Sequence, residues 1–339
     1  MNFFGDVNLP TFNKEKTNIP RHILSNNNIF NFESVCVEEQ KASTRGIALS
    51  SNQESVEKFC SLGFNIAGLA NNHISDFDDS ISETIKFLGL NNIRNFGAGS
   101  NISEASRYIR VEEQDEEYYV IGAGWDVIGC QYADKKRAGI NPYSSQELKQ
   151  SVCEILKINN NAKIFCFFHY NYEFEEYPQP ADRKLFHELI DMGVEGIIGH
   201  HSHVVGPYES YNGKYIFYSL GNFFMPKVVT RGYNVVYPER AYEGISVEYL
   251  NNKVKIHWYK NIDDYIEYYK TEDIEHTTLV NLTRKVGTDN YLNWFSKNRI
   301  KSKLLPIFKD YDKNNLFNSN FVKFRNFTIN MAVKFRVKR

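Results

Sequence analysis

The chain has 339 residues, of which 42% are hydrophobic and 24% are charged, and its formal net charge at pH 7 is -1. This composition supplies enough apolar surface for a buried core, which excludes a disordered or fibrous chain, and the even charge argues against a nucleic-acid-binding protein. Residues 301–339 contain ten Lys and Arg but only two acidic residues, so the body of the chain is acidic and its tail is basic.

Short apolar runs that end in Gly, Asn or His alternate with stretches of helical period over about the first 220 residues, which is the order of an α/β fold. We expect strands at Asn2–Gly5, Ile29–Ser34, Asn65–Leu69, Tyr118–Gly122, Lys163–Phe168 and Gly196–Ile198. The intervening apolar spacing predicts helices at Glu54–Leu62, Asp79–Leu90, Gln146–Leu156 and Asp182–Met192.

From residue 214 the pattern becomes typical of strands, at residues 214–220, 244–250 and 253–260, and Asn251-Asn252 predicts a hairpin turn between the last two. The sequence predicts helices at Asp263–Val286 and Tyr291–Lys309. The basic, aromatic segment from residue 321 shows no clear helical or strand period. We therefore expect a first domain over residues 1–260 and a helical, basic extension over residues 261–339.

Five scattered cysteines without a CxxC pair predict neither a disulfide framework nor a cysteine zinc site, and we expect them to be reduced core thiols. The N-terminus lacks a basic segment followed by an apolar one, and no apolar run reaches the roughly 18 residues of a membrane span. We therefore expect a cytoplasmic protein.

Side chains that can bind metals gather where the predicted strands end. Because the carboxyl ends of strands in an α/β sheet converge on one crevice, we expect residues from distant segments to meet there. The candidates are Asp6 and Asn8 after the first strand, Asn31 and Glu33 in the second, Asn72 and His73 after the third, His169 after the fifth, and His200, His201 and His203 after the sixth.

This set offers carboxylate, imidazole and amide groups but no thiolate, which suits Mn, Fe, Zn or Mg. A carboxylate can bridge two divalent ions, and such a pair orients a phosphoryl group and lowers the pKa of a bridging water, which favours hydrolysis. In an extended segment His201 and His203 would point to the same side, an arrangement that indicates metal binding. Taken singly, Asp6 also fits a turn or cap residue, and Asn72-His73 also fits a loop with local hydrogen bonds.

The order of these motifs resembles the capsule-biosynthesis (CapA, poly-γ-glutamate synthesis accessory) family, whose fold belongs to the calcineurin-like metallophosphoesterases. The matching segments are GDVNL at 5–9, NFES at 31–34, GLANNHISDF at 68–77, FGAGSNISEA at 96–105, FFHYNYEFEEYPQP at 167–180, LIDMGVEGIIGHHSHVVGPYE at 189–209 and YSLGNFF at 218–224. The resemblance implies a four-layer α/β/β/α sandwich. It departs from the general metallophosphoesterase pattern where Asp6-Val7-Asn8 replaces D-x-H and where Glu33 replaces the carboxylate of GDxxD.

The resemblance also implies roles for individual residues. Asp6, His201 and His203 would hold metal ions, Glu33 would bridge or support them, and Asn72 with His169 would complete the second site. His73 would be the catalytic cation beside the leaving group. Substrate contacts or support of the ligands would come from Asn8, Asn31, Glu173, His200 and Asn222.

The expected function is a phosphoesterase with two divalent metal ions, acting on a phosphorylated small molecule or glycan intermediate of capsule or other surface-polysaccharide synthesis. Two alternatives stay open: a non-hydrolytic accessory protein of a capsule or poly-γ-glutamate polymer synthase, and a metal-dependent amide hydrolase. An arginine-rich phosphate pocket would favour the phosphoesterase over the amide hydrolase, and its candidates are Arg45, Arg137, Arg183 and Arg231.

Members of this family often carry an N-terminal membrane anchor, whereas this sequence starts directly at its first predicted strand. Its basic, aromatic tail is an alternative means of contact with the inner membrane face or with the polysaccharide-synthesis machinery. A solvated helical appendage explains the same tail equally well.

Overall fold

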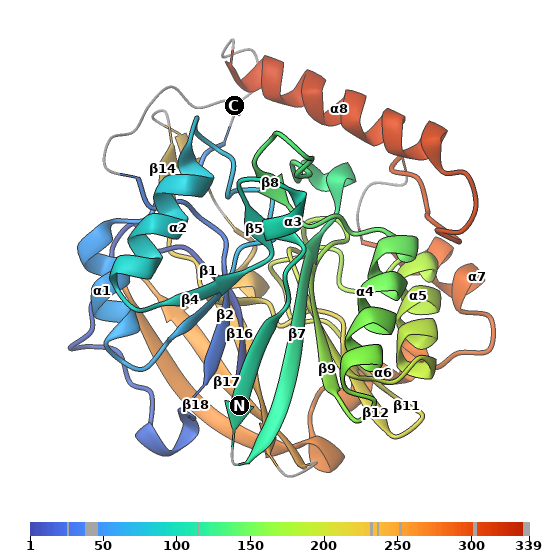
Figure 1. The fold of residues 1–339 in the computed structure, drawn as a ribbon, viewed down its shortest axis with the longest axis horizontal. Coiled ribbons are helices and arrows are strands. Elements are labelled where there is room, and N and C mark those ends of the chain that lie inside the picture. The colour runs from blue at the N-terminus through green and yellow to red at the C-terminus, as the bar shows by residue number, and fades with distance from the viewer. Residues whose placement is uncertain are drawn as a thin grey trace.

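Two large β-sheets form the centre of the molecule, and helices cover their outer faces (Figure 1). The computed structural model describes residues 1–25, 27–37, 47–113, 115–230, 233–235, 237–250, 253–300 and 304–334. In that part of the chain the first sheet has the order β18 (Tyr265–Asp273), β17 (Lys253–Ile262), β16 (Glu243–Leu250), β1 (Asn2–Val7), β2 (Asn28–Phe32), β3 (Ile66–Gly68) and β4 (Arg94–Phe96), with β13 (Asn222–Phe224) beside β1.

The second sheet has the order β11 (Tyr208–Tyr211), β12 (Lys214–Phe217), β10 (Val194–His200), β9 (Lys163–His169), β7 (Glu116–Gly124) and β6 (Ile109–Glu113). Two short ribbons pair β5 (Ala98–Gly99) with β8 (Gly139–Ile140) and β14 (Val228–Thr230) with β15 (Tyr233–Val235). Neighbouring strands from β1 to β4 are parallel, as are β7, β9, β10 and β12. Each parallel set therefore brings its carboxyl ends to one edge of its sheet.

The helices connect these strands and extend the chain beyond them. The α-helices are α1 (Gln53–Cys60), α2 (Ser80–Leu90), α3 (Ile102–Ala105), α4 (Ser145–Ile158), α5 (Pro180–Asp191), α6 (Val280–Val286), α7 (Tyr291–Asn298) and α8 (Leu316–Lys334). Short 3-10 helices are η1 (Arg21–Ile23), η2 (Asp126–Ile128), η3 (Glu239–Tyr242) and η4 (Ile274–His276). In the described residues, none of the helices has both the length and the apolar character needed to cross a membrane.

The buried side chains form three apolar layers, because successive residues of a strand point to opposite faces of the sheet. Phe3 of β1 packs between the sheets against Phe165 of β9, with ring centroids 4.9 Å apart. The next residue, Phe4, faces α1 and α2 instead, and Phe168 of β9 faces α4 and α5. The layers therefore follow the order α/β/β/α, which confirms the expected four-layer sandwich.

The segment after β18 packs on the helices of the second sheet. Tyr291 and Phe295 of α7 are buried in the same apolar layer as α4 and α5, together with Phe308. The carbonyl of Phe308 accepts a hydrogen bond from the backbone N–H of Ala181, at 3.0 Å. Residues 291–300 and 304–308 therefore contribute to the core of the second half of the sandwich.

Several expectations for the C-terminal half are wrong. Asp263–Val286 is not one helix, because β18 pairs with β17 along its length and α6 begins only at Val280. The domain division expected at residue 260 stays a prediction, and that residue lies inside β17. Within the described part of Tyr291–Lys309 only α7 is helical, and the described part of the tail from residue 321, which showed no clean period, belongs to α8. The turn expected at Asn251-Asn252 lies outside the described residues.

The five cysteines are all free thiols, as expected, but they are not all in the core. Cys36, Cys130 and Cys166 are buried, whereas Cys60 is partly exposed and Cys153 is exposed. Cys153, in α4, lies outside the apolar face of its helix, whereas Cys60, at the end of α1, packs at the edge of the apolar layer between that helix and the first sheet.

Candidate metal centre

The carboxyl ends of the parallel strands in both sheets meet at one place and carry buried polar side chains. Asp6 of β1 is the register partner of Asn31 of β2, and His169 and His200 are register partners at the ends of β9 and β10. None of these four side chains is more than 2% exposed. The two sheets thus bring together groups that lie almost 200 residues apart in the chain.

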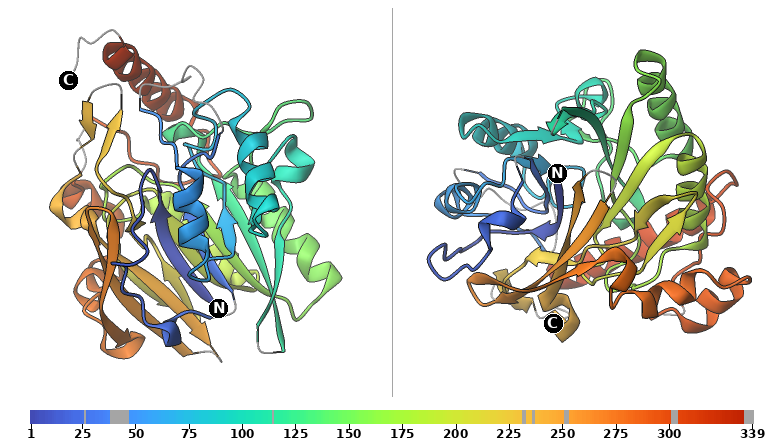
Figure 2. Two further views of the ribbon diagram at one scale, coloured as in Figure 1. Left: turned by 90° about the vertical axis from the view of Figure 1, so that its left-hand side faces the viewer. Right: turned by 90° about the horizontal axis from the view of Figure 1, so that it is seen from below.

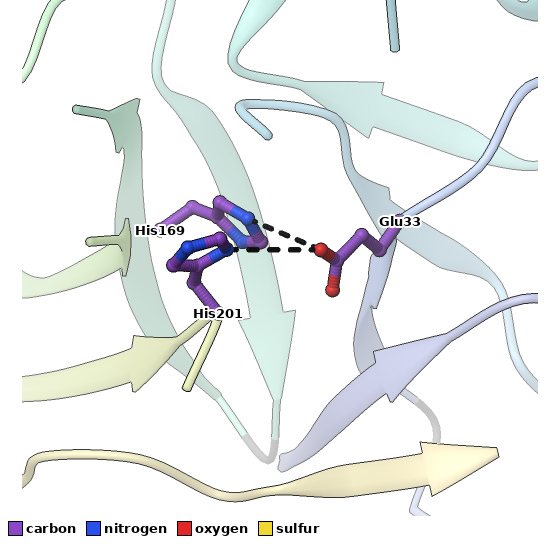
Figure 3. Close-up of side chains that lie close together, drawn as sticks. All are labelled: Glu33, His169 and His201. Carbon is purple, nitrogen blue, oxygen red and sulfur yellow. Dashed lines mark ion pairs between the residues drawn. The ribbon is translucent and has the colours of Figure 1, made fainter. Parts of the chain in front are cut away.

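Glu33, His169 and His201 form one group of side chains that could hold a metal ion. Glu33 follows β2, His169 ends β9 and His201 follows β10, and the two imidazoles face the carboxylate (Figure 3). Oε1 of Glu33 lies 3.4 Å from Nε2 of His169 and 3.9 Å from Nδ1 of His201. Since metal bonds to imidazole and carboxylate are about 2.0–2.2 Å long, one ion can span these gaps with small side-chain movements.

Asp6, Glu33 and His203 form a second group, which shares Glu33 with the first. Nδ1 of His203 lies 3.5 Å from Oδ2 of Asp6, and its Nε2 lies 3.7 Å from Oε1 of Glu33. In each group the ligand atoms lie within 4.8 Å of one another. A single carboxylate therefore stands between two sets of ligands, as a bridging ligand would.

Buried polar atoms without hydrogen bonds mark the centre of this cluster. Among the described residues, neither carboxylate oxygen of Glu33 has a hydrogen-bond partner, and neither does Nδ1 of His201. Leaving such a group buried and unpaired costs about 1–3 kcal/mol, and more when it is charged. A divalent cation would satisfy all three atoms, so the donor set fits the metal site expected from the sequence, and its oxygen and imidazole ligands suit Mn, Fe, Zn or Mg.

Two asparagine side chains, Asn31 and Asn72, contact the ligands Asp6 and His169. Nδ2 of Asn31 donates a hydrogen bond to Oδ1 of Asp6 at 2.8 Å and lies 3.1 Å from Nδ1 of His169. Nε2 of His169 lies 2.7 Å from Oδ1 of Asn72, which places this amide oxygen beside the first ligand group. Such partners fix the orientation of the side chains they contact.

Asn222 orients the second group from the neighbouring strand β13. Its Oδ1 lies 2.9 Å from Nδ1 of His203, and its Nδ2 donates to the carbonyl of Ala241 at 2.9 Å. The carbonyl thus fixes which end of the amide is the acceptor. His203 consequently donates from Nδ1 and keeps Nε2 directed at Glu33.

The segment that carries His201 and His203 is not extended, so the expected reason for their common direction is wrong. Both residues have left-handed backbone conformations, with φ of 86° and 58°. Side chains with a Cβ avoid this region, and such strain, of about 1–3 kcal/mol per residue, is concentrated at functional sites. The turn, rather than alternation along a strand, aims both rings at Glu33.

Burial and the charges of neighbouring side chains raise the pKa of some ligands and lower the pKa of others. Burial raises the pKa of Glu33 well above its ordinary value, against the effect of His203. Burial would raise the pKa of Asp6 too, but hydrogen bonds with His200 and His203 hold it well below its ordinary value. Burial and the charge of His203 lower the pKa of His201 to about 3, which leaves it the neutral imidazole that a metal requires.

His73 lies at the edge of the cluster and belongs to neither ligand group. Its Nε2 is 4.0 Å from Oε1 of Glu33, and its Nδ1 is 2.6 Å from Oδ2 of Asp76. The same Asp76 oxygen accepts a hydrogen bond from the backbone N–H of Leu49 at 2.8 Å, which fixes the carboxylate. Asp76 is the functional residue missed from the sequence, although its spacing of three residues from His73 was a visible signal.

The remaining candidates surround the cluster in different ways. Glu173 is exposed, and its charge contributes to the raised pKa of Glu33, so it lies on the solvent side of the ligands. Nδ1 of His200 is 3.2 Å from Oδ1 of Asp6, which places it behind that ligand. The amide oxygen of Asn8 accepts hydrogen bonds from two serine hydroxyls and thereby stabilises the loop after β1.

The arginines named as phosphate-binding candidates do not assemble at the cluster within the described residues. Arg137 lies beside Asp134, and Arg183 forms a bidentate ion pair with Glu209. Arg45 and Arg231 lie outside the described residues. An arginine-rich pocket therefore stays a prediction.

Comparison with known proteins places the chain in a family. The family "Bacterial capsule synthesis protein PGA_cap" matches residues 21–227. The PGA biosynthesis protein CapA of Bacillus subtilis (strain 168) is 30% identical over 205 residues, which are 59% of this chain and 53% of that protein. The capsule biosynthesis protein CapA of Bacillus anthracis is 27% identical over 249 residues, which are 68% of this chain and 61% of that protein. The chain thus spans between half and two thirds of the length of these relatives.

Among solved structures, that of a hypothetical protein from Thermus thermophilus is similar with a TM-score of 0.43 and 14% identity, over 80% of this chain and 98% of that one. The family match covers more than half of the chain and contains both ligand groups apart from Asp6. The chain therefore belongs to the bacterial capsule synthesis protein PGA_cap family.

Proposed function

We propose that this chain is a metal-dependent phosphoesterase that acts in the synthesis of a bacterial capsule or related surface polymer. The observation that carries the proposal is the buried Glu33 carboxylate, which has no hydrogen-bond partner among the described residues and is shared by two ligand groups. Membership of the capsule synthesis family supports the biological setting. The substrate would be a phosphorylated small molecule or a phosphorylated glycan intermediate.

Two divalent ions would be held by the two ligand groups, one by Asp6, Glu33 and His203 and the other by Glu33, His169 and His201 with Asn72. When bound, they would neutralise charge on a phosphoryl group and lower the pKa of the attacking water.

The other residues of the centre would act on the substrate directly. His73 in its cationic form would donate a proton from Nε2 to the leaving oxygen, while Asp76 holds the ring by Nδ1. Glu173, on the exposed side of the ligands, would contact the substrate as it enters. His200 and Asn31 would keep Asp6 ionised and in position.

The test combines metal content with turnover of simple substrates. The purified chain is loaded in parallel with Mn, Zn, Mg or Fe(II) and assayed on p-nitrophenyl phosphate, bis(p-nitrophenyl) phosphate and γ-glutamyl p-nitroanilide. We expect phosphate-ester hydrolysis that depends on the bound metal and is lost, together with the metal, in Glu33→Gln and His201→Ala. His276→Ala is the matched control, because His276 is exposed and lies outside the cluster. Bound metal without any hydrolysis would instead indicate a non-catalytic accessory protein.

A metal-dependent amide hydrolase is the second candidate, and the positions of the two candidate arginines that the structure describes are compatible with it. Arg137 and Arg183 are paired with acidic residues elsewhere, so neither supplies a phosphate contact in the described part of the chain. A metal centre activates water for attack on a carbonyl as well as on phosphorus. Turnover of the γ-glutamyl anilide without turnover of either phosphate ester would select this candidate.

A further inference from the structure

Helix α8 presents a row of phenylalanine side chains to solvent. Phe317, Phe324 and Phe327 are 84%, 68% and 60% exposed, and Phe321 is 42% exposed. Residues 317, 321 and 324 are separated by four and three positions, which places them on one face of the helix. Single exposed apolar residues are ordinary on a protein surface, but a contiguous row of large rings marks an interaction site.

The opposite face of α8 anchors the helix to the body of the protein. Val322 is 1% exposed and packs into the apolar layer that contains α4 and α5. Lys323 forms an ion pair with Asp126 of η2, and Nδ2 of Asn326 donates to the carbonyl of Val127 at 3.4 Å. These contacts hold the helix so that the phenylalanine face points away from the protein.

The phenylalanine face lies at the same end of the molecule as the candidate metal centre. In Figure 1 and in the left view of Figure 2, α8 runs along the end opposite the N-terminus. Strand β1 starts beside the N-terminus at Asn2, and Asp6 lies near its other end. The helix η2, on which α8 rests, follows β7, and the neighbouring strand β9 ends at His169.

The charge of this region selects the kind of partner. Besides Lys323, which is paired with Asp126, helix α8 contains Arg325 and Lys334 and no acidic residue, and residues 301–339 hold ten basic residues against two acidic ones. A second copy of this chain would bring an equally basic helix to the interface, which like-charge repulsion disfavours. A surface that is negatively charged outside and apolar beneath complements both the cations and the rings.

We infer that α8 docks this protein on an anionic lipid membrane, with its phenylalanine rings inserted at the headgroup boundary. A basic helix with a row of exposed aromatic rings can lie in the plane of the interface and bury those rings among the headgroups and upper acyl chains, while its cations meet anionic lipid. The rest of the chain is acidic and is repelled by the same lipid, so docking through α8 orients the molecule. The end that carries the metal centre then faces the membrane. This inference does not depend on any catalytic activity.

Sedimentation of the full-length protein with lipid vesicles tests the inference. The probes are phosphatidylcholine vesicles with and without phosphatidylglycerol. We expect binding to the anionic vesicles only, weakened by added salt, and reduced at least about tenfold in the triple variant Phe317→Ser, Phe324→Ser, Phe327→Ser. Because all three rings are exposed, the variant should keep the thermal unfolding midpoint of the parent protein.

A matched control removes exposed apolar side chains elsewhere. Leu90 at the end of α2 and Ile158 at the end of α4 are 74% and 70% exposed, and Leu90→Ser with Ile158→Ser should leave vesicle binding unchanged. Equal binding of the parent and the triple variant would overturn the inference, as would absence of binding by the parent protein. A dimer of the parent that the triple variant abolishes, seen by light scattering, would overturn it in favour of a second copy on this face.

Discussion

Oδ2 of Asp76 lies 2.6 Å from Nδ1 of His73 and thereby turns the other nitrogen of the ring toward Glu33, 4.0 Å away. His73 is consequently next to both ligand groups without belonging to either. A histidine in this position can exchange a proton with a substrate while other residues hold the metal. The structure therefore separates the residues that would bind metal from the one that would transfer a proton.

The substitution His73→Ala should keep the metal and lose activity. We expect phosphate-ester turnover to fall by ~10²–10⁴-fold, as is typical for loss of a proton-transfer residue, with unchanged metal content by elemental analysis. His201→Ala provides the comparison, because it should lose both. Loss of metal from the His73 variant would place His73 among the ligands and contradict its proposed role.

Asp76→Asn tests the orientation of the same ring. The amide cannot replace the charge that holds Nδ1 of His73, so we expect turnover to fall by ~10–100-fold while metal content stays unchanged. A variant with normal turnover would show that Asp76 acts only on the Leu49 loop.

Metal affinity should rise with pH. In the protein without metal, burial raises the pKa of Glu33 well above its ordinary value. Although burial acts in the other direction, Glu33 and Asp6 raise the pKa of His203 to about 10. Both groups bind metal only after losing their protons, so the bound form carries fewer protons and higher pH favours it, by up to about tenfold in affinity per pH unit for each proton released.

Titration of Mn or Zn into the metal-free protein between about pH 6 and about pH 8 measures this linkage. Calorimetry in buffers of different ionisation enthalpy would count the protons released. An affinity that does not change with pH would contradict the protonation states inferred for Glu33 and His203.

The centre of the fold was predictable because its strands are unusually apolar and end in polar residues. Strands such as β9, with the sequence KIFCFFH, are buried on both faces. They can therefore be recognised in the sequence as continuous apolar runs, although they lack the alternating pattern of a half-buried strand. The polar residues that follow them share one edge by the geometry of parallel sheets. This is why Asp6, His169 and His203 could be grouped before their distances were known.

Other features were not predictable, for specific physical reasons. Strand β18 alternates mostly between partly buried and exposed residues and is rich in charge, which made it resemble a polar helix. Helix α8 keeps its large apolar residues on the solvent side, so its pattern does not point to the core. The left-handed conformations of His201 and His203 are set by tertiary contacts, since residues other than glycine, histidine included, adopt positive φ only uncommonly.

Glu209→Gln should reduce stability at neutral pH but not in acid. Arg183 donates to both carboxylate oxygens of Glu209, at 3.0 and 2.6 Å. Although burial acts in the other direction, hydrogen bonds from His187, Arg183 and Tyr218 lower the pKa of Glu209 to about 2 from its ordinary value of 4.5. The folded state therefore resists protonation, so this stabilisation is complete above about pH 4.5 and is lost as the pH falls toward 2.

Urea unfolding at several pH values measures this effect. At pH 7 the free energy of unfolding should fall by about 1.5–3 kcal/mol in the variant, the range for hydrogen bonds to charged groups. The difference should shrink as the pH drops below about 4.5. Glu154→Gln, at an exposed position of α4, is the control and should show no change. If the two proteins differed in free energy of unfolding by the same amount at every pH, the shape of the Glu209 side chain rather than its charge would account for the stabilisation.

Truncation after residue 260 should unfold the protein. It removes β18, with the fully buried Ile266, and it also removes Tyr291, Phe295 and Phe308 from the core. Loss of a large buried side chain costs about 3–5 kcal/mol, so four such losses, about 12–20 kcal/mol, match or exceed the roughly 5–15 kcal/mol that stabilise a typical domain. Circular dichroism should therefore show no cooperative thermal transition, and a cooperatively folded product would contradict this view of residues 261–315.

Truncation after residue 315 should instead leave a folded, metal-binding protein. It removes α8, whose buried contribution in the described residues is Val322 together with polar contacts to η2. Loss of one small apolar contact and two polar ones, of which one is exposed and the other part-buried, should cost only about 1–3 kcal/mol. Because the ligand groups lie between residues 6 and 203, metal content and hydrolysis of a small soluble ester should match those of the full chain. Binding to anionic vesicles should be lost, since the exposed phenylalanines are gone. If the folded truncated protein binds metal but no longer hydrolyses the soluble ester, α8 helps to form the substrate site, and its role is not confined to the membrane.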